Sequence, residues 1–365
     1  MARADGGAGA SDPAAGQGRA RRRGADGPKR RRIAAAALLA LCALLLFFAV
    51  LENGAPMVTE LSVPCAGLPE GFEGFRIAQV SDLHNAVPGG GNDALLALLA
   101  QSAPDLIAIT GDLIDSRRPD VAAALAFVQE AARIAPVYYV TGNHEARAPD
   151  AFAALERGLA ALSVRTLRDE AVALCSGGGT ITLVGLDDPA FHTDGRDAQA
   201  QERARLERTL ARLYDGEGFA LLLTHRPEYF EAYAAAGVGL TLAGHAHGGQ
   251  IRLPFFGGLY APGQGFFPAY DAGLYRRGGS AMAVSRGLGN SILPLRINNR
   301  PELVVVTLLP PTRTRPPDGQ ARAGRPRPHV FRRPNHPPTG RGGAPFWRAA
   351  PAASLCTFLP PGPHR

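Results

Sequence analysis

The sequence predicts an α/β domain that follows one apolar helix. From residue 75 onward, apolar strand-like runs alternate with segments of helical spacing, a pattern typical of layered α/β domains. The strand-like runs are continuously apolar, as in strands that are buried on both faces. The chain has 365 residues and 46% of them are hydrophobic, which is enough for a substantial core.

The apolar helix is expected at residues 33–51, nineteen positions without a charge. A helix of this length reaches roughly 28 Å at about 1.5 Å per residue, close to the hydrocarbon thickness of a bilayer. Four basic residues stand at 29–32, so the positive-inside tendency places residues 1–32 in the cytoplasm. A cleaved signal peptide has a similar layout, but the long apolar run and the absence of an A-x-A-like site in the following "ENGAP" favour a retained anchor.

The basic character of the chain belongs to its ends. The formal charge is +7 overall, but +6 of it lies in residues 1–32 and +9 in residues 310–365, which leaves −8 for residues 33–309. Because a duplex-binding body usually has a basic face, we expect no nucleic acid to bind the folded domain. Residues 310–365 hold fourteen prolines and little apolar periodicity, which predicts a disordered Pro/Arg-rich tail.

The elements follow from the alternation of the pattern. Residues 52–69 are expected to form a short extended lead-in, and residues 70–309 the folded domain. Strands are predicted at 75–82, 106–112, 136–145, 180–189, 219–228 and 239–249, and helices at 93–105, 120–135, 152–164 and about 198–214. The runs 282–290 and 302–309 are predicted to pair and close a second sheet.

Polar clusters stand where the predicted strands end. They are "SDLH" with Asp82 and His84, "GD" with Asp112, "GNHE" with Asn143, His144 and Glu145, "THRPE" with His225, and "GHAH" with His245 and His247. Functional residues of α/β sheets gather at the carboxyl ends of strands, so we expect these side chains to lie in one layer. Taken singly, the aspartates could be helix N-caps and Asn143 a turn residue.

The residue types suit a pair of metal ions. Two divalent cations roughly 3.5 to 4 Å apart clamp the oxygens of a displacement at phosphorus and bring the pKa of a bound water near neutrality. Such a pair needs a bridging carboxylate and several neutral imidazoles, and Asp112 is the expected bridge because its motif holds no second acid beside it. A mixed Asp/Asn/His set suits manganese, iron or zinc more than calcium, and the order of affinities leaves the metal open.

In this order, the five clusters resemble the calcineurin-like metallophosphoesterase superfamily, whose pattern runs D-x-H, GD, GNH[DE], H and GHxH. All five blocks are present, and they span residues 82–247. The resemblance implies a four-layer sandwich of two mixed β-sheets flanked by helices, with a two-metal site at the strand ends. The transmembrane helix would precede this domain.

The resemblance also implies a role for each residue. The first metal would be held by Asp82, His84, Asp112 and His247, and the second by Asp112, Asn143, His225 and His245. His144 would be catalytic and would protonate the leaving oxygen or stabilise charge on the phosphoryl group. Glu145 would fix the ring of His144, as carboxylates near metal sites do for imidazoles, and Gln250 is a further candidate for contact with the ligands or the substrate.

Three more segments are similar to a membrane-anchored branch that includes phosphodiesterases of lipid-linked substrates: "LPEGFEGFRIAQVSDLH", "GHAHGGQIRLP" and "NNRPEL". We therefore expect a single-pass protein of the cell membrane whose extracytoplasmic domain is a metal-dependent phosphodiesterase. A UDP-2,3-diacylglucosamine-type pyrophosphatase is the nearest alternative, although its substrate would lie on the cytoplasmic side. A non-catalytic metal-binding scaffold or sensor is the alternative of another class. The Gly- and aromatic-rich segment 261–275 would be a loop over the pocket, a lipid-facing lip or simple packing.

Overall fold

The computed structural model describes residues 27–54, 56–85, 92–192, 198–290, 296–311 and 354–355. The chain divides into two compact units, residues 1–48 and residues 49–365. Most of the predicted Pro/Arg-rich tail and most of the predicted basic N-terminal segment lie outside the described residues. Their predicted properties therefore stay predictions.

The predicted anchor falls on helix α1 (Gly27–Asn53). Within the part of the chain that the structure describes, no helix has the length and apolar character needed to cross a bilayer. The side chains at positions 42, 45, 46 and 48–52 lie outside that part, so the membrane anchor stays a prediction.

A six-stranded mixed sheet carries the first three polar clusters. In spatial order its strands are β1 (Met57–Pro64), β16 (Glu302–Leu309), β2 (Arg76–Val80), β3 (Leu106–Thr110), β4 (Val137–Val140) and β5 (Arg165–Thr166). β2, β3, β4 and β5 are parallel, whereas β16 runs antiparallel to β2 and parallel to β1. The predicted strands at 75–82, 106–112 and 136–145 are confirmed as β2, β3 and β4, except that residues 143–145 begin a helix. The predicted lead-in supplies β1.

A seven-stranded mixed sheet carries the other two clusters. Its strands are β14 (Gly273–Arg277), β15 (Ser280–Val284), β9 (Leu240–Ala243), β8 (Ala220–Leu223), β7 (Gly179–Gly185), β6 (Glu170–Ser176) and β17 (Ser354–Leu355). The prediction that the last two strands pair with each other is wrong, because β15 joins this sheet and β16 joins the other. Nearly every residue of β16 is buried, so the strand needs a partner on each side and a layer on each face.

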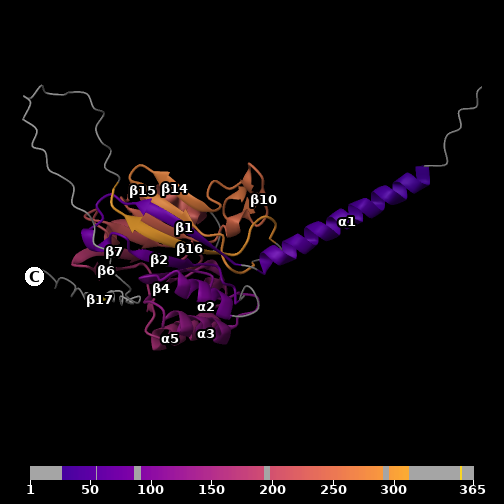
Figure 1. The fold of residues 1–365 in the computed structure, drawn as a ribbon. Coiled ribbons are helices and arrows are strands. Elements are labelled where there is room, and N and C mark those ends of the chain that lie inside the picture. Colours follow the sequence, from indigo (N-terminus) through magenta and orange to yellow (C-terminus); the bar gives the residue numbers. More distant parts are fainter. Residues whose placement is uncertain are drawn as a thin grey trace, which may run out of the picture. The chain divides into compact units, whose positions relative to one another are not determined.

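Helices cover the outer face of each sheet. α2 (Asn92–Gln101), α3 (Val121–Ala131) and α5 (Pro149–Ala161) pack on the six-stranded sheet, and α6 (Ala198–Leu213) and α7 (Phe230–Ala235) on the seven-stranded sheet. Successive side chains of β3 point to opposite faces of the sheet. Leu106 and Ala108 face the other sheet, whereas Ile107 and Ile109 face the helices. The predicted α/β class with two mixed sheets and flanking helices is confirmed (Figure 1).

Short elements complete the described chain. They are α4 (Asn143–Arg147), the 3-10 turns Glu70–Phe72, Pro189–Phe191, Pro227–Tyr229 and His247–Gly249, and the two-residue strands β10 (Arg252–Leu253), β11 (Gly257–Gly258), β12 (Tyr260–Ala261) and β13 (Gly265–Phe266). Two of them begin with ligand candidates, because α4 starts at Asn143 and one 3-10 turn starts at His247.

The two sheets meet closely at the carboxyl ends of their central strands. The amide of Gln79 in β2 donates to Thr110 Oγ1 at 3.0 Å and to the carbonyl of Ala243 in β9 at 2.9 Å. A Cβ atom on Gly244 would lie 2.0 Å from Ser81 Oγ and 2.5 Å from Asp82 Oδ2. Only glycine allows this approach, which brings the loops after β2 and β9 together.

Candidate metal centre

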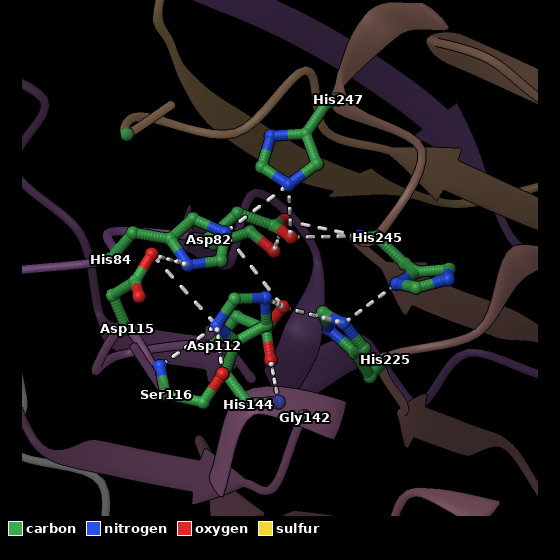
Figure 2. A network of polar contacts seen from close by, with 12 residues as sticks. Asp82, His84, Asp112, Asp115, Ser116, Gly142, His144, His225, His245 and His247 are labelled. Atoms are coloured by element: carbon green, nitrogen blue, oxygen red, sulfur yellow. Dashed lines mark hydrogen bonds and ion pairs between the residues drawn. The ribbon is translucent and has the colours of Figure 1, made fainter. Parts of the chain in front are cut away.

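The polar loops of both sheets converge on one buried cluster (Figure 2). The loops after β2, β3 and β4 come from the six-stranded sheet, and the loops after β8 and β9 come from the other. The structure buries and brings together all nine residues that the motifs single out: Asp82, His84, Asp112, Asn143, His144, Glu145, His225, His245 and His247.

Five of these residues have an unusual backbone. Asp82, His84, Asp112, His245 and His247 have φ angles of 51°, 49°, 50°, 66° and 48°. Residues other than glycine seldom adopt this left-handed conformation, and where they do, the strain often marks a functional site. The turned backbone directs these side chains inward from the strand ends.

Asp82, His84 and His247 form the first group of donor atoms. His247 Nε2 lies 3.3 Å from Asp82 Oδ1 and 3.2 Å from His84 Nε2. One ligand atom from each of the three residues lies within 4.8 Å of the others. The group draws on both sheets, since His247 follows β9 and the other two residues follow β2.

Asp112, His225 and His245 form the second group. His225 Nε2 lies 3.3 Å from Asp112 Oδ2 and 3.1 Å from His245 Nδ1. The same Asp112 oxygen lies 3.7 Å from His84 Nε2 in the first group. A single carboxylate oxygen therefore faces both groups, as a bridging ligand would.

Asn143 lies at the edge of the second group. One end of its amide is 2.9 Å from His245 Nδ1 and the other end is 2.8 Å from Arg147 Nη1. With the amide nitrogen toward His245 the contact is a hydrogen bond. With the oxygen toward it, two acceptors face each other, an arrangement that a shared cation stabilises.

His144 is held so that Nε2 faces the cluster. Its Nδ1 accepts a hydrogen bond from the backbone N–H of Ser116 at 2.9 Å, and its Nε2 lies 4.0 Å from Asp112 Oδ2. Because Nδ1 accepts, the proton of the neutral ring resides on Nε2. His144, His84 and Asp115 make a third group of close donor atoms. Asp115 was missed by the motifs, although it stands three residues after Asp112.

Glu145 orients the backbone around Asp112. Its carboxylate accepts four hydrogen bonds of 2.8 to 3.2 Å from the N–H groups of Asp112, Leu113, Ile114 and Gly142. The expectation that Glu145 fixes the ring of His144 is therefore corrected, because Ser116 contacts the ring instead. Burial raises the pKa of Glu145 to about 7, and the charge of Asp112 is the second cause.

Gln250 caps the turn that begins at His247 through its backbone N–H. A role for its side chain stays a prediction.

A partly buried arginine that sequence reasoning missed contacts the second group. Arg226 Nη1 lies 2.9 Å from His245 Nε2. The same guanidinium pairs with Asp188 through two contacts of 2.6 and 3.1 Å. Such a two-pronged pair fixes the guanidinium plane and with it the neighbouring imidazole. Only sequence position could have indicated these two residues, because Arg226 directly follows His225 and Asp188 follows the end of β7.

Arg296 is the second arginine that the motifs do not reveal. It is fully buried and donates to the carbonyls of Arg286 and Gly289 and to the side chain of Asn290. Its Nη2 lies 3.5 Å from His247 Nδ1. Burial lowers the pKa of Arg296 to about 10. No pattern in the sequence around it indicates such a position.

The histidines of the cluster differ in charge. Burial lowers the pKa of His84 to about 4 and those of His245 and His247 well below the ordinary value. Burial also opposes a proton on His225, but the adjacent Asp112 outweighs it and raises the pKa of His225 to about 10. Burial acts to raise the pKa of Asp112, and the charge of His225 nevertheless holds it well below its usual range. Three imidazoles are thus neutral at pH 7, the form that binds metals.

The donor set fits divalent cations. Ring nitrogens face each other at 3.2 Å between His84 and His247 and at 3.1 Å between His225 and His245. Among the described residues, the buried Nδ1 of His84 has no hydrogen-bond partner. Crowding buried polar atoms in this way is costly unless cations lie among them, and imidazole with carboxylate suits manganese, iron or zinc.

A cleft of about 320 Å³ opens onto the cluster. Its lining consists of Asp112, Ser116, Arg117, Asn143, His144, Arg147, His245, His247 and Pro262. This volume suits a small ligand, and guanidinium groups such as those of Arg117 and Arg147 match the oxygens of a phosphate. Fold and site together define a hydrolase class that acts on phosphoesters at a pair of metal ions.

Comparisons with known proteins agree with this class. Residues 75–249 match the family model described as calcineurin-like phosphoesterase. An uncharacterized metallophosphoesterase of Bacillus subtilis, YkuE, is 32% identical over 270 residues, which cover 71% of this chain and 87% of that protein. The chain belongs to the calcineurin-like phosphoesterase family. It is a phosphoester hydrolase whose cofactors are two divalent metal ions.

Two further relatives differ in their descriptions. The phosphodiesterase YaeI of Escherichia coli is 28% identical over 239 residues, which cover 64% of this chain and 82% of that protein. A transmembrane protein with metallophosphoesterase domain from Bos taurus is 28% identical, and the match covers 69% of this chain and 57% of that protein. Among solved structures, the phosphopantetheinyl hydrolase of Mycobacterium tuberculosis gives a TM-score of 0.39 at 15% identity, over 59% of this chain and 89% of that one.

Proposed function

We propose that this protein is a membrane-anchored, metal-dependent phosphodiesterase. The observation that carries the proposal is the position of Asp112 Oδ2, which lies 3.7 Å from His84 Nε2 and 3.3 Å from His225 Nε2. One oxygen is thereby within reach of two metal positions. Two divalent cations held by these residues would activate water and polarise the phosphoryl oxygens.

The proposed ligand sets follow the groups of close donor atoms. Asp82, His84, Asp112 and His247 hold the first metal, and Asp112, Asn143, His225 and His245 hold the second. Two of the three groups in the structure are subsets of these two sets. The third group joins His84 to Asp115 and His144, and we assign Asp115 to the support of the two imidazoles.

His144 supplies a proton to the leaving oxygen. The hydrogen bond from Ser116 N–H to Nδ1 leaves the ring proton on Nε2, which faces the cleft. Burial lowers the pKa of His144, so the resting ring is neutral and directs its Nε2–H toward the leaving oxygen. Arg117 and Arg147 at the same cleft orient the phosphoryl group.

The proposed preference for diesters and the proposed membrane anchor are supported by the names of relatives and by the sequence. The relative from Escherichia coli is named a phosphodiesterase, and the relative from Bos taurus is named a transmembrane protein. The sequence has an uncharged apolar run at 33–51 with basic residues before it. We propose that this run anchors the chain and that the phosphodiesterase domain lies outside the cytoplasm.

Hydrolysis of chromogenic substrates tests the activity. Bis(p-nitrophenyl) phosphate and p-nitrophenyl phosphate are supplied with added Mn²⁺ to the wild type, Asp82→Asn and His144→Ala. We expect the wild type to prefer the diester and Asp82→Asn to lose most of the rate. His144→Ala should lose less, because p-nitrophenolate leaves without a proton. Asp93→Asn changes an exposed carboxylate of α2 and is the matched control. Equal rates in all four proteins would remove the proposal and favour the binding-only alternative.

Topology has a separate test. An alkaline-phosphatase reporter fused after residue 60 is active only if the chain after the anchor leaves the cytoplasm. We expect an active reporter. An inactive one would reverse the proposed orientation and would make a cytoplasmic nucleotide-lipid accessible as substrate.

A further inference from the structure

An exposed aromatic surface follows directly after the ligand candidates of the last motif. Residues 251–270, here called the aromatic hairpins, carry the pairs β10–β11 and β12–β13. Their exposed large apolar side chains are Leu253, Phe255, Phe256, Tyr260, Phe266 and Phe267. Phe255 is fully exposed, and Phe256 and Phe266 are 74% and 71% exposed. A cluster of this kind usually marks a contact with another molecule or with a membrane.

The hairpins are ordered by hydrogen bonds at their base. The carboxylate of Asp271 accepts from the backbone N–H of Gly258 at 2.6 Å and from Arg252 Nη1 at 2.9 Å. The side chain of Gln264 and the backbone of Tyr270 exchange two hydrogen bonds of 2.8 and 2.9 Å. This base fixes the hairpin backbone, and the phenylalanines therefore project from an ordered structure.

Two of the exposed phenylalanines occupy a strained backbone conformation. Phe255 has a φ of 69° and Phe267 a φ of 53°. Bulky residues rarely adopt this left-handed region, and such outliers persist only where the surroundings impose them. Rings held outward at a conformational cost point to a use for their exposure.

The chemistry of the hairpins suits the interfacial layer of a bilayer. Between residues 251 and 270 the sequence contains one charged side chain, Arg252, and no acid. The guanidinium of Arg252 is engaged by Asp271 and by the carbonyl of Gly248. Aromatic rings partition into the boundary between headgroups and acyl chains, and the segment itself adds no acid that would repel anionic lipids.

The hairpins are also tied to the end of the apolar helix. Asn53 is the last residue of α1, and its side chain exchanges two hydrogen bonds, both of 3.1 Å, with the backbone of Arg296. The next residue, Ile297, is 42% exposed and forms a β-bridge with Ile251. If residues 33–51 span the bilayer, Asn53 follows the end of the span by two residues, and these contacts join the hairpins to Asn53.

We propose that the aromatic hairpins insert into the bilayer surface and present the cleft to a phosphoester carried on a lipid headgroup. Pro262 of the hairpins lines the same cleft as His144, His245 and His247, so insertion places the mouth of the cleft beside the headgroups. The proposal rests on the proposed anchoring and phosphodiesterase activity, and it specifies the substrate as amphipathic.

Fluorescence quenching in vesicles tests the insertion. The full chain is reconstituted in phosphatidylcholine vesicles with and without brominated acyl chains. Its single tryptophan, Trp347, is replaced by phenylalanine, and a new tryptophan is placed by Phe256→Trp or, as the control, by Glu217→Trp. Glu217 is exposed and precedes β8 at the sheet edge opposite the metal ligands.

We expect bromine to reduce the emission of the Phe256→Trp protein by about twofold, because interfacial side chains enter about 5–10 Å into the bilayer. The Glu217→Trp protein should keep its emission. Equal emission of the Phe256→Trp protein with both lipids would overturn the proposal. If the hairpins of two copies could also be cross-linked to each other in that case, the exposed surface would be assigned to a dimer.

Activity provides a readout that separates this proposal from the proposed function. In the double variant Phe255→Ser/Phe256→Ser, the rate on soluble bis(p-nitrophenyl) phosphate should match the wild type. Its rate on a lipid-linked p-nitrophenyl phosphodiester in phosphatidylcholine vesicles should fall by about tenfold, because the apolar contact with the bilayer is lost. An unchanged vesicle rate would overturn the insertion surface. A wild type inactive on the soluble diester would instead overturn the proposed function, and the quenching result would still stand.

Discussion

The two sheets contribute different chemistry to the proposed metal centre. The six-stranded sheet supplies both candidate carboxylates and the amide, together with two imidazoles: Asp82, Asp112, Asn143, His84 and His144. The seven-stranded sheet supplies imidazoles alone: His225, His245 and His247. Each of the two groups that match a proposed ligand set takes donors from both sheets. Neither sheet completes either of these two groups by itself, so metal binding depends on how the sheets pack.

Direct contacts maintain this packing beside the site. His225 Nδ1 lies 2.8 Å from the carbonyl of Thr110, across the boundary between the sheets. The backbone N–H of His245 lies 3.1 and 3.2 Å from the two carboxylate oxygens of Asp82. The ligand candidates of one sheet are therefore positioned by groups of the other. Changes on the two sides should have distinguishable effects.

Removal of the charge at the shared carboxylate should have the largest effect. In Asp112→Asn the oxygen that faces both groups loses its charge, and metal activation is worth several kcal/mol of transition-state stabilisation. We expect kcat on bis(p-nitrophenyl) phosphate to fall by at least about 10³-fold. Circular dichroism should show an intact fold. A loss of less than tenfold in a folded variant would remove Asp112 from its central position.

Replacement of the proton donor should reduce the rate without removing the metals. General acid catalysis is worth about 10²-fold or more, so His144→Ala should lose about that factor on a diester with an alkyl leaving group. The loss should be smaller with p-nitrophenolate, which leaves without a proton. Equal losses with both leaving groups would contradict the assigned role, as would a fall in bound metal.

Separation of the sheets should reduce stability and metal affinity together. A methyl group on Gly244 meets Ser81 Oγ and Asp82 Oδ2, and overpacking of this kind costs about 1–3 kcal/mol. In Gly244→Ala the free energy of unfolding in urea should fall by that amount. Gly279→Ala is the control, since a Cβ there meets nothing within 4 Å. If both variants were as stable as the wild type, the close approach would not matter.

Metal loading should release a proton, which is the smallest effect. Without metal, the pKa of His225 is about 10, so its ring is charged at pH 7 and must become neutral to bind a cation. Apparent metal affinity should therefore rise with pH between 7 and 10. Calorimetric titrations at pH 7 in two buffers of different ionisation enthalpy should show about one proton released from this group. Identical heats in both buffers would contradict a charged His225.

The ligand candidates were predictable because each stands directly after a buried strand. Parallel strands place their carboxyl ends at one edge, so Asp82, Asp112 and His245 had to lie close together once the strands were recognised. The place of β16 was not predictable, since a continuous apolar run fits the centre of either sheet. Pairing with β1 and β2 places β16 in the six-stranded sheet. This pairing depends on contacts between residues that are distant in sequence.

The sequence analysis also missed residues whose contacts depend on how the loops fold. Asp115 and Arg226 each stand beside a recognised motif, but only the folded loops show that they contact His144 and His245. Arg296 reaches His247 across 49 positions of sequence. For segment 261–275 the sequence left packing and a lipid-facing lip equally open. The exposure of Phe266 and Phe267 argues against packing.

Metal stoichiometry tests the central claim most directly. Elemental analysis after Mn²⁺ or Zn²⁺ loading should give two ions per chain for the wild type and a clear loss of metal for Asp112→Asn. Asp115→Asn is the matched control, because Asp115 belongs to the third donor group and is assigned to no metal; it should keep two ions. Retention of both ions by Asp112→Asn, with their loss from Asp115→Asn, would contradict the account.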